Sequence, residues 1–320
     1  MNILYISSGH KRIYEWFDEC IKRALNSLGS SYSFFDPFEP TTNLNKVLNR
    51  QSFDLMLTMV GDKLSNKKLS IIKNHQIPTC IWLTEDPYYL RYTAEYFFHY
   101  DYVFTIDQAS QRFYKSKQHK NVYHLPLATD LRTYRPPKEN QKQLFDVTLV
   151  GYPYENRKEI IQTLIDETPY KIQLVGRWFN ELTPSQRKRV SISPWKYPRK
   201  VSSIYNAGKI NLNLLRPMTD KHNDIIRGVN NKSINNRTFD LAACQAFQIK
   251  QRVEDVYDYF EEEKEIVTFK NLEDCLEKIH YYLPRKQLRD QIAKEAYQKV
   301  ISKHTFTNRL EKIFSIVNGN

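Results

Sequence analysis

An arginine and an aspartate three positions apart are the residues of this sequence best suited to hold a phosphate-bearing ligand. They are Arg237 and Asp240, in the stretch NNRTFDLAACQAFQI at 235–249. Residues three apart share one helical face, and backbone N–H groups and the helix dipole favour an anion at a helix N-terminus. We therefore expect Arg237 to bind phosphate and Asp240 to accept hydrogen bonds from ribose hydroxyls. The alternative is a buried helix whose Arg and Asp form an ion pair.

A base that activates an acceptor hydroxyl is expected in the first half of the chain. His10 follows an apolar run, and an imidazole is tunable near neutral pH. Glu85 and Asp86 are adjacent carboxylates, whose mutual repulsion raises one pKa. We expect an Asp86→Asn variant to lose transfer and keep donor binding. The alternatives are a loop histidine and a plain helix-start turn at Asp86-Pro87.

The elements that must position these residues alternate between apolar runs and helical periodicity, which is typical of parallel sheets covered by helices. In the first half we expect strands at 3–7, 32–35, 53–59, 78–83, 102–106 and 122–125, and helices at 13–25, 43–49, 64–74, 89–98 and 108–116. In the second half we expect strands at 145–150, 170–175, 209–214, 247–249 and 266–269, and helices at 155–166, 200–206, 253–260, 272–282, 285–300 and 306–317, besides the helix that carries Arg237. Residues 177–195 are expected to be irregular.

The aperiodic segment 128–143, which contains Pro136-Pro137, is interpreted as a linker between two α/β halves. Ligands of such sheets bind beyond the carboxyl ends of the strands. The sequence thus predicts a cleft between the halves, and its expected lining is Ser8–His10, Glu85–Pro87 and Asp107 on one side and Gly151, Gly176, Arg216 and Arg237 on the other.

Gly151 and Gly176 each end a predicted strand, where glycine lets backbone N–H groups approach a ligand closely. The alternative is a turn that needs positive φ. Arg216 and Arg177 are further candidates for a phosphate, with exposed loop charges as the alternative.

Composition excludes several classes of protein. The 320 residues are 41% hydrophobic and include no run of about 18 apolar residues, so no transmembrane segment is expected. The start, MNILYISSGHKR, does not resemble a signal peptide, and the four cysteines show no CxxC spacing, so we expect a cytoplasmic protein with reduced thiols and no metal site.

The net charge of +12 points to an anionic partner, but the basic residues are spread along the chain, so nucleic acid is not expected. The sequence has neither a G-x-G-x-x-G after its first strand nor a P-loop motif, which argues against a dinucleotide dehydrogenase and a P-loop NTPase.

Several segments resemble CgeB-type spore maturation proteins, which are glycosyltransferase-like. They are IWLTEDPYYL (81–90), DYVFTID (101–107), HLPLATD (124–130), DVTLVG (146–151), INLNLLR (210–216), NNRTFDLAACQAFQI (235–249) and KHTFTNRLEKIF (303–314). The resemblance covers most of the chain, and its most specific parts are the Arg237–Cys244 segment and the Glu85-Asp86-Pro87 segment.

The resemblance implies a GT-B fold: two Rossmann-like domains with parallel sheets facing a central cleft. Residues 1–135 would bind the acceptor, 136–302 would bind a nucleotide-sugar donor, and 303–320 would pack back on the first domain. In such a fold, the candidate catalytic residues are Asp86, Glu85 and His10, and the candidate nucleotide-binding residues are Gly151, Gly176, Arg177, Arg216, Asn236, Arg237 and Asp240. No cofactor or metal is implied besides the donor.

The expected function is therefore metal-independent transfer of a sugar from the donor to a glycan or protein. If the role of the family carries over, the acceptor belongs to a spore outer layer. Two departures from related sequences bear on activity: Lys232 and Asp240 stand where many GT-B enzymes have two glutamates, and Gln245 stands where glycine is common. They motivate the alternative of a catalytically degenerate module that binds a nucleotide or glycan. The sequence does not assign an oligomeric state.

Overall fold

The computed structural model describes residues 1–137 and 141–319 and divides into two compact units. Unit 1 is Met1–Leu127, Lys221–Ser233 and the chain from Phe306 onward, and unit 2 is Ala128–Asp220 and Ile234–Thr305. Residues 138–140 of the predicted linker and residue 320 of the predicted closing segment lie outside the described residues.

Unit 1 is built on a six-stranded sheet in which all pairs of described strands are parallel. In spatial order the strands are β2 (Ser31–Phe35), β1 (Asn2–Ile6), β3 (Leu55–Met59), β4 (Thr79–Leu83), β5 (Tyr102–Thr105) and β6 (Val122–His124). The helices are α1 (Ile13–Ser27), α2 (Thr41–Arg50), α3 (Asn66–Asn74), α4 (Leu90–Thr93), η1 (Phe97–His99), α5 (Gln108–Ser116) and α13 (Phe306–Val317).

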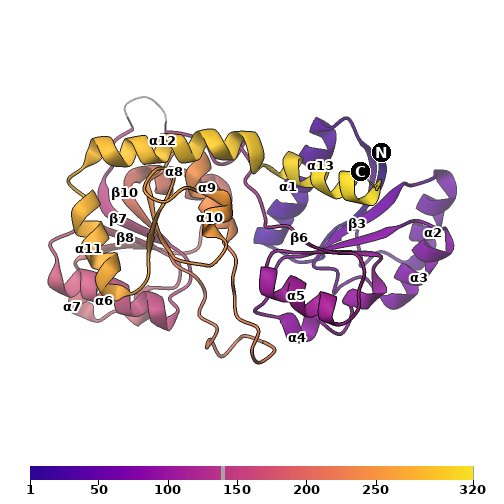
Figure 1. Ribbon diagram of the computed structural model, residues 1–320, viewed down its shortest axis with the longest axis horizontal. Helices are drawn as coiled ribbons and strands as arrows, with labels where there is room; N and C mark the ends of the chain where they lie inside the picture. The colour runs from indigo at the N-terminus through magenta and orange to yellow at the C-terminus, as the bar shows by residue number, and fades with distance from the viewer. Residues whose placement is uncertain (138–140, 320) are drawn as a thin grey trace. The chain divides into compact units, whose positions relative to one another are not determined.

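The core of unit 1 lies on both faces of this sheet. Every residue of β3 and β4 is buried, as expected for parallel strands covered by helices on each side. The closing helix α13 lies beside α1 (Figure 1), and Phe306 at its start meets the rings of Trp16 and Trp82, each with a centroid distance of 6.2 Å.

Unit 2 repeats this plan with a second six-stranded parallel sheet. In spatial order its strands are β12 (Val267–Phe269), β11 (Gln248–Gln251), β10 (Gly208–Asn213), β7 (Phe145–Val150), β8 (Ile172–Val175) and β9 (Val190–Ser193). The helices are α6 (Glu155–Glu167), η2 (Phe179–Glu181), α7 (Pro184–Arg187), α8 (Pro198–Ala207), α9 (Asn236–Ala243), α10 (Val256–Tyr259), α11 (Leu272–Tyr282) and α12 (Lys286–Lys303).

The strand order of each sheet contains one switch point. In unit 1 the chain moves from β1 outward to β2 and then returns to β3 on the other side of β1. In unit 2 it moves from β7 outward to β9 and then returns to β10 on the other side of β7. Such switch points open a crevice beyond the carboxyl ends of the two central strands, where ligands of α/β sheets bind.

Two predicted elements differ in the structure. The segment expected to be irregular contains η2, α7 and β9, an edge strand paired with β8 whose four residues (VSIS) alternate apolar and polar side chains over only the minimum length of a recognisable strand. The helix predicted at 89–98 is wrong: α4 ends at Thr93, and η1 is separate. The Thr93 hydroxyl lies within hydrogen-bonding distance of the Leu90 carbonyl, at 3.2 Å, and of Asp86, at 3.1 Å, and this side-chain bonding competes with continuation of the helix.

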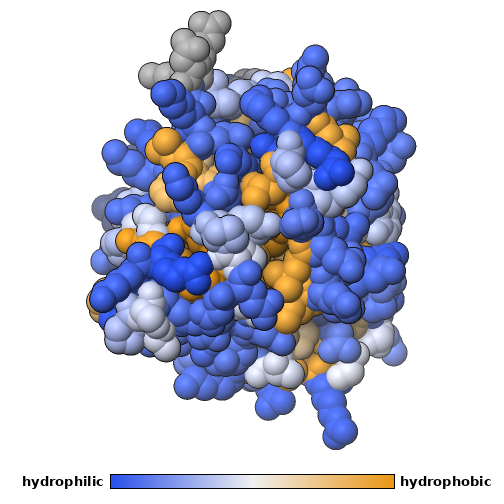
Figure 2. Space-filling view, turned by 90° about the vertical axis from the view of Figure 1, so that its left-hand side faces the viewer, coloured by the Kyte–Doolittle hydropathy of each residue, from blue (hydrophilic) through white to orange (hydrophobic). Residues whose placement is uncertain are grey.

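The face drawn in Figure 2 is mostly hydrophilic, and its hydrophobic residues lie in small areas separated by polar ones. This agrees with a mean hydropathy of −0.63. Among the described helices, none combines the length and the apolar character that a bilayer crossing requires. The predicted fold class, two Rossmann-like α/β domains with parallel sheets, is confirmed for each unit.

Candidate functional site

Unit 1 contains a cavity of about 570 Å³ beyond the carboxyl ends of β1, β3 and β4. The cavity thus lies at the switch point between β1 and β3, and its volume is in the usual range for a small-molecule pocket. It is lined by three carboxylates and by His10 and a group of tyrosines; the lining residues are His10, Tyr14, Val60, Asp62, Lys63, Glu85, Tyr89, Tyr92, Thr93, Tyr96 and Asp224.

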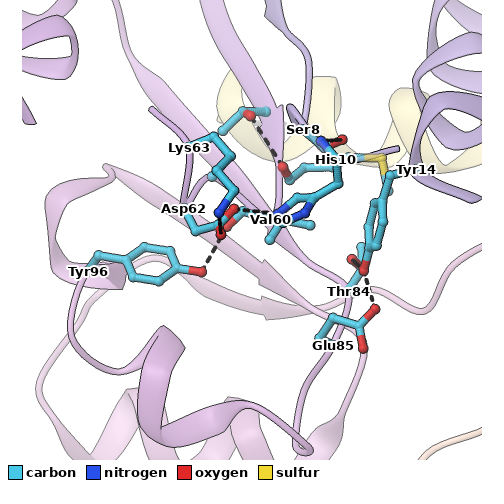
Figure 3. A network of polar contacts seen from close by, with 12 residues as sticks. Ser8, His10, Tyr14, Val60, Asp62, Lys63, Thr84, Glu85 and Tyr96 are labelled. Carbon is cyan, nitrogen blue, oxygen red and sulfur yellow. Dashed lines mark hydrogen bonds and ion pairs between the residues drawn. The ribbon is translucent and has the colours of Figure 1, made fainter. Parts of the chain in front are cut away.

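A histidine–aspartate pair stands at the wall of this cavity (Figure 3). Nε2 of His10 lies 2.8 Å from Oδ1 of Asp62, and Nζ of Lys63 lies 3.0 Å from Oδ2 of the same carboxylate. Asp62 is nearly buried, whereas a third of the His10 side chain is exposed. A carboxylate that accepts from Nε2–H fixes the imidazole tautomer and leaves the lone pair on Nδ1, which is the arrangement of an oriented general base.

Glu85 is the second predicted residue at the cavity. Its carboxylate accepts a short hydrogen bond from the Tyr14 hydroxyl, which also lies 3.2 Å from the Thr84 hydroxyl (Figure 3). Burial raises the pKa of Tyr14 well above its ordinary value, and the neighbouring Glu85 charge raises it further. Tyr14 therefore stays protonated and holds Glu85 as an acceptor, so that Glu85 and His10 line the same space.

Asp86 occupies a different environment from its neighbour Glu85. It is 1% exposed, and its carboxylate accepts hydrogen bonds from Thr105 at 2.7 Å, Thr93 at 3.1 Å and Tyr114 at 3.0 Å. Asp86 is not among the described residues that line the cavity, although its carboxylate accepts a hydrogen bond from Thr93, which is. The structure therefore brings Glu85 and His10 together and leaves Asp86 in the core, which favours a structural role over the predicted catalytic one.

Burial raises the pKa of Asp86 to about 6, against the opposing hydrogen bonds from Thr105, Tyr114 and Thr93. The folded protein therefore holds this proton between about pH 4 and pH 6, where the unfolded chain releases it. Over that window the free energy of unfolding falls as pH rises, by roughly 3 kcal/mol for two pKa units.

An Asp86→Asn variant is expected to lack this pH dependence. Denaturant unfolding of both proteins from pH 4 to pH 7 measures it: the stability of the wild type relative to the variant should fall by roughly 3 kcal/mol across the range. Parallel plots of stability against pH for the two proteins would contradict the raised pKa of Asp86. A variant that is stable but inactive in sugar transfer would support the predicted catalytic role of Asp86.

In unit 2 two guanidinium groups converge on Gly151, which directly follows β7. A Cβ on Gly151 would lie 2.5 Å from Nη1 of Arg157 and 3.3 Å from Nη2 of Arg237. Arg157 is 4% exposed and donates to the carbonyls of Tyr152 at 2.9 Å and Leu214 at 2.6 Å, so it ties the loop after β7 to the loop after β10. This is the switch point of the second sheet, and two cations meet there.

The glycines at this edge serve packing rather than direct ligand contact by their N–H groups. The N–H of Gly151 donates to Val175 and that of Gly176 donates to Ser193, each at 2.9 Å, so both are used in extending the sheet. A Cβ on Gly176 would lie 2.3 Å from the Gly151 carbonyl oxygen. The N–H groups of both glycines are therefore used within the sheet, and both residues have a positive φ, 156° and 144°, as the alternative interpretation expects; their contact with a nucleotide stays a prediction.

Arg237 lies in the first turn of α9, as predicted, and it is half-buried. The side chain of the N-cap residue Asn235 accepts from the Thr238 N–H, which fixes the start of the helix. Asn236 donates to Asp240 at 3.1 Å. Asp240 is 2% exposed, and burial raises its pKa well above the ordinary value while the Arg237 charge opposes the rise. Asp240 is thus beneath the surface, and its contact with a ribose stays a prediction.

The two other predicted arginines differ from Arg237 in their surroundings. Arg216 pairs with Asp220 at 3.2 Å, so its charge is already compensated, and its guanidinium lies 5.6 Å from the Tyr154 ring. Arg177 is exposed. Arg177 therefore agrees with the alternative interpretation of an exposed loop charge, whereas the Arg216 side chain is only 14% exposed. Because Arg216 is already paired, Arg237 remains the strongest of the three candidates for binding phosphate.

The departures at Gln245 and Lys232 lie outside α9, whereas Asp240 lies within it. Gln245 follows the C-terminal end of α9 and has a φ of 50°, which is the left-handed conformation that glycine adopts at helix ends. Lys232 belongs to unit 1, where its N–H donates to Asp107 at 2.8 Å. Gln245 therefore bears on how the helix ends, and not on the anion site at its start.

Sequence reasoning missed three charged residues at these sites: Asp62, Arg157 and Lys250. Asp62 follows β3 just as His10 follows β1, so the strand-end rule applied to every strand finds it. Lys250 directly follows the predicted strand 247–249 and lies inside β11, so a charged residue at the end of a predicted strand was the available signal. Within the residues that the structure describes, no group of three or more His, Cys, Asp or Glu side chains is arranged to hold a metal ion.

Solved structures with the same fold include glycosyltransferases of the GT-B type. Sucrose-phosphate synthase from Thermosynechococcus elongatus aligns over 100% of this chain and 99% of its own, with a TM-score of 0.70 and 11% identity. HepE from Anabaena in complex with UDP and glucose aligns over 100% of both chains, with a TM-score of 0.66 and 12% identity. An alpha-glucosyltransferase in complex with UDP aligns over 99% of both chains, with a TM-score of 0.71 and 9% identity.

In sequence, the chain is 27% identical over 320 residues to spore protein CgeB of Bacillus subtilis (strain 168), and the alignment covers 99% of this chain and 98% of that protein. This confirms the predicted resemblance. A family model described as glycosyl transferase-like matches residues 156–315, which is half of the chain and includes α9 with Arg237. The chain therefore belongs to the glycosyl transferase-like family.

Proposed function

We propose that this protein transfers a hexose from a nucleotide-diphosphate sugar to a glycan or protein acceptor without a metal ion. The observation that carries the proposal is the meeting of Arg157 and Arg237 at Gly151, beside the N-terminus of α9. Preorganised cations and a helix N-terminus stabilise the charge that develops on a departing diphosphate. The UDP complexes of HepE and the alpha-glucosyltransferase support a nucleotide donor.

The acceptor half of the proposal rests on the cavity of unit 1. His10, oriented by Asp62, would take the proton of an acceptor hydroxyl, and Glu85 would accept a hydrogen bond from another hydroxyl of the same acceptor. Tyrosine rings at the wall, such as Tyr92 and Tyr96, provide apolar faces with polar edges, which suit a sugar ring.

Because the similar CgeB is called a spore protein, the acceptor we propose first is a spore-surface glycan or protein. The predicted exclusion of nucleic acid stays a prediction, since one alpha-glucosyltransferase structure of this fold contains a 13-mer DNA with an HMU base. The acceptor assay should therefore include DNA. All four cysteines are buried free thiols, which agrees with the expected reducing cytoplasm.

A thermal-shift screen with UDP, dTDP, GDP and CDP tests the donor assignment, because a ligand that binds only the folded state raises the melting temperature. Sugar transfer from the matching donor, with and without EDTA, then tests the activity. Nucleotide binding without transfer to any acceptor would favour the alternative of a degenerate binding module.

An Arg237→Ala variant is expected to bind the nucleoside diphosphate tens-fold more weakly, since loss of a charge-assisted hydrogen bond costs about 2–3 kcal/mol. Isothermal titration calorimetry measures the change. The matched control is Arg177→Ala, which removes an exposed arginine of the same unit and is expected to bind as the wild type does. Equal affinity of the Arg237→Ala variant and the wild type would reject the phosphate site.

A further inference from the structure

The second sheet contains a lysine that the activity proposed above does not use. Lys250 lies on β11 in register with Asn213 of β10 and Thr268 of β12, and its side chain is fully buried. Within the described part of the chain, its Nζ makes no hydrogen bond. A buried ammonium group without a hydrogen-bonding partner is strongly unfavourable, and such groups either lose their proton or serve a ligand.

The charged groups that act on Lys250 come from two neighbouring segments. Burial lowers its pKa, Asp255 after β11 opposes this, and Arg237 of α9 adds to the lowering; the result of all three is a pKa of about 7. The register partners Asn213 and Thr268 carry no charge. Near neutral pH the amine is therefore close to half-protonated, so that a modest change in the local charge decides its state.

The surroundings of Lys250 are those of the anion site. Asp255 accepts the Ile234 N–H at 2.9 Å, which anchors the segment entering α9 to the segment leaving β11. Arg237, which acts on Lys250, is the same residue that reaches the loop after β7 at Gly151. The start of α9 is thus flanked by an accessible arginine and by a buried lysine whose Nζ has no hydrogen bond.

We propose that Lys250 takes a proton from solvent when a nucleoside diphosphate binds at the start of α9, so that the site gains a second cation beside Arg237. The proton adds to the lone pair of Nζ, and no bond of the ligand breaks. An anion nearby favours the ammonium form, just as Arg237 disfavours it. This inference rests on the proposed function, because it requires that a diphosphate binds there.

The linkage of binding to proton uptake is measurable by calorimetry. UDP, or CDP, GDP or dTDP if the screen selects it, is titrated at pH 7.5 in PIPES and in Tris, whose ionisation enthalpies differ. The wild type is expected to show an enthalpy that depends on the buffer and corresponds to uptake of more than half a proton per site, as expected for an amine with a pKa of about 7. A Lys250→Met variant is expected to bind with no such uptake.

The matched control is Lys209→Met, which removes a lysine of the adjacent strand β10 that is 38% exposed and paired with Asp146. It should retain the uptake of the wild type. If Lys250→Met binds the diphosphate too weakly to titrate, the pH dependence of binding by the wild type tests the proposal instead. The dissociation constant of the wild type should rise between pH 7.5 and pH 9, by up to tenfold for each pH unit.

The outcomes separate this inference from the proposed function. Diphosphate binding by the wild type with equal proton uptake in Lys250→Met, or an affinity that does not change with pH, would overturn the role of Lys250 and leave the donor site in place. If none of the four nucleoside diphosphates binds to the wild type, both proposals are rejected.

Discussion

A His10→Ala variant is expected to transfer sugar about 10²–10⁴-fold more slowly than the wild type, the usual loss when a positioned general base is removed. The structural basis is the contact of 2.8 Å between Nε2 of His10 and Oδ1 of Asp62 at the wall of the unit 1 cavity. The affinity for the nucleoside diphosphate should not change, because the diphosphate site is proposed in unit 2. Steady-state kinetics with saturating donor measures kcat, and calorimetry measures the affinity.

The same site offers a second variant and a control. Asp62→Asn should lower kcat as well, because an amide no longer fixes the imidazole tautomer as a carboxylate does. His75→Ala removes an exposed histidine at the end of α3 and should retain full activity. If His10→Ala works within twofold of the wild type, His10 is not the base, and Glu85 becomes the candidate to replace.

The Lys250→Met variant is expected to be more stable than the wild type at pH 7, by roughly 3–5 kcal/mol. Burial lowers the pKa of this lysine from 10.5 to about 7, so the folded state holds its proton less firmly than the unfolded chain does. Between about pH 7 and pH 10 the unfolded chain holds more protons, and the free energy of unfolding rises with pH. Below pH 7 the buried charge of Lys250 destabilises the folded state to its full extent. Methionine has a similar length and no charge, so the substitution removes this destabilisation.

Unfolding of both proteins in denaturant at pH 7 and pH 9.5 measures this effect. The advantage of the variant should shrink at the higher pH, because the wild-type lysine is then neutral in the folded state and loses less on folding. Lys209→Met provides the comparison, and loss of its half-exposed ion pair with Asp146 should change stability by about 1 kcal/mol or less. A less stable Lys250→Met protein would show that the lysine supports the fold. A stabilised variant with lost proton uptake would instead identify a residue kept for function at the expense of stability.

The local elements of this protein follow from its sequence. The predicted strand 145–150 is β7, and the predicted helices 108–116, 272–282 and 306–317 are α5, α11 and α13. Continuous apolar runs such as those of β3 and β4 identify strands buried on both faces, and their alternation with amphipathic helices allows only a parallel α/β arrangement. The strand β9 was not predicted because its alternation of apolar and polar residues spans only four positions, Val190–Ser193.

The sequence also indicated where side chains able to catalyse a reaction or bind a ligand would lie close together, because parallel strands present their carboxyl ends at one edge of the sheet. His10 and Glu85 were predicted in this way and Arg237 from the expected start of a helix, and the structure places His10 and Glu85 at the cavity and Arg237 beside Gly151. What the sequence could not supply is direction and burial. Glu85 and Asp86 are adjacent in the sequence, yet Glu85 lines the cavity, whereas Asp86 accepts hydrogen bonds from three hydroxyl groups in the core.

The pairings across each unit were decided by the tertiary structure alone. Asp62 meets His10 from 52 positions away, and Arg157 meets the carbonyl of Leu214 from 57 positions away. Lys250 is a surface residue by its type and a core residue by its place in β11. The physical reason is that local sequence fixes backbone periodicity, whereas desolvation and charge proximity arise from segments that are distant along the chain and become neighbours only when the sheet forms.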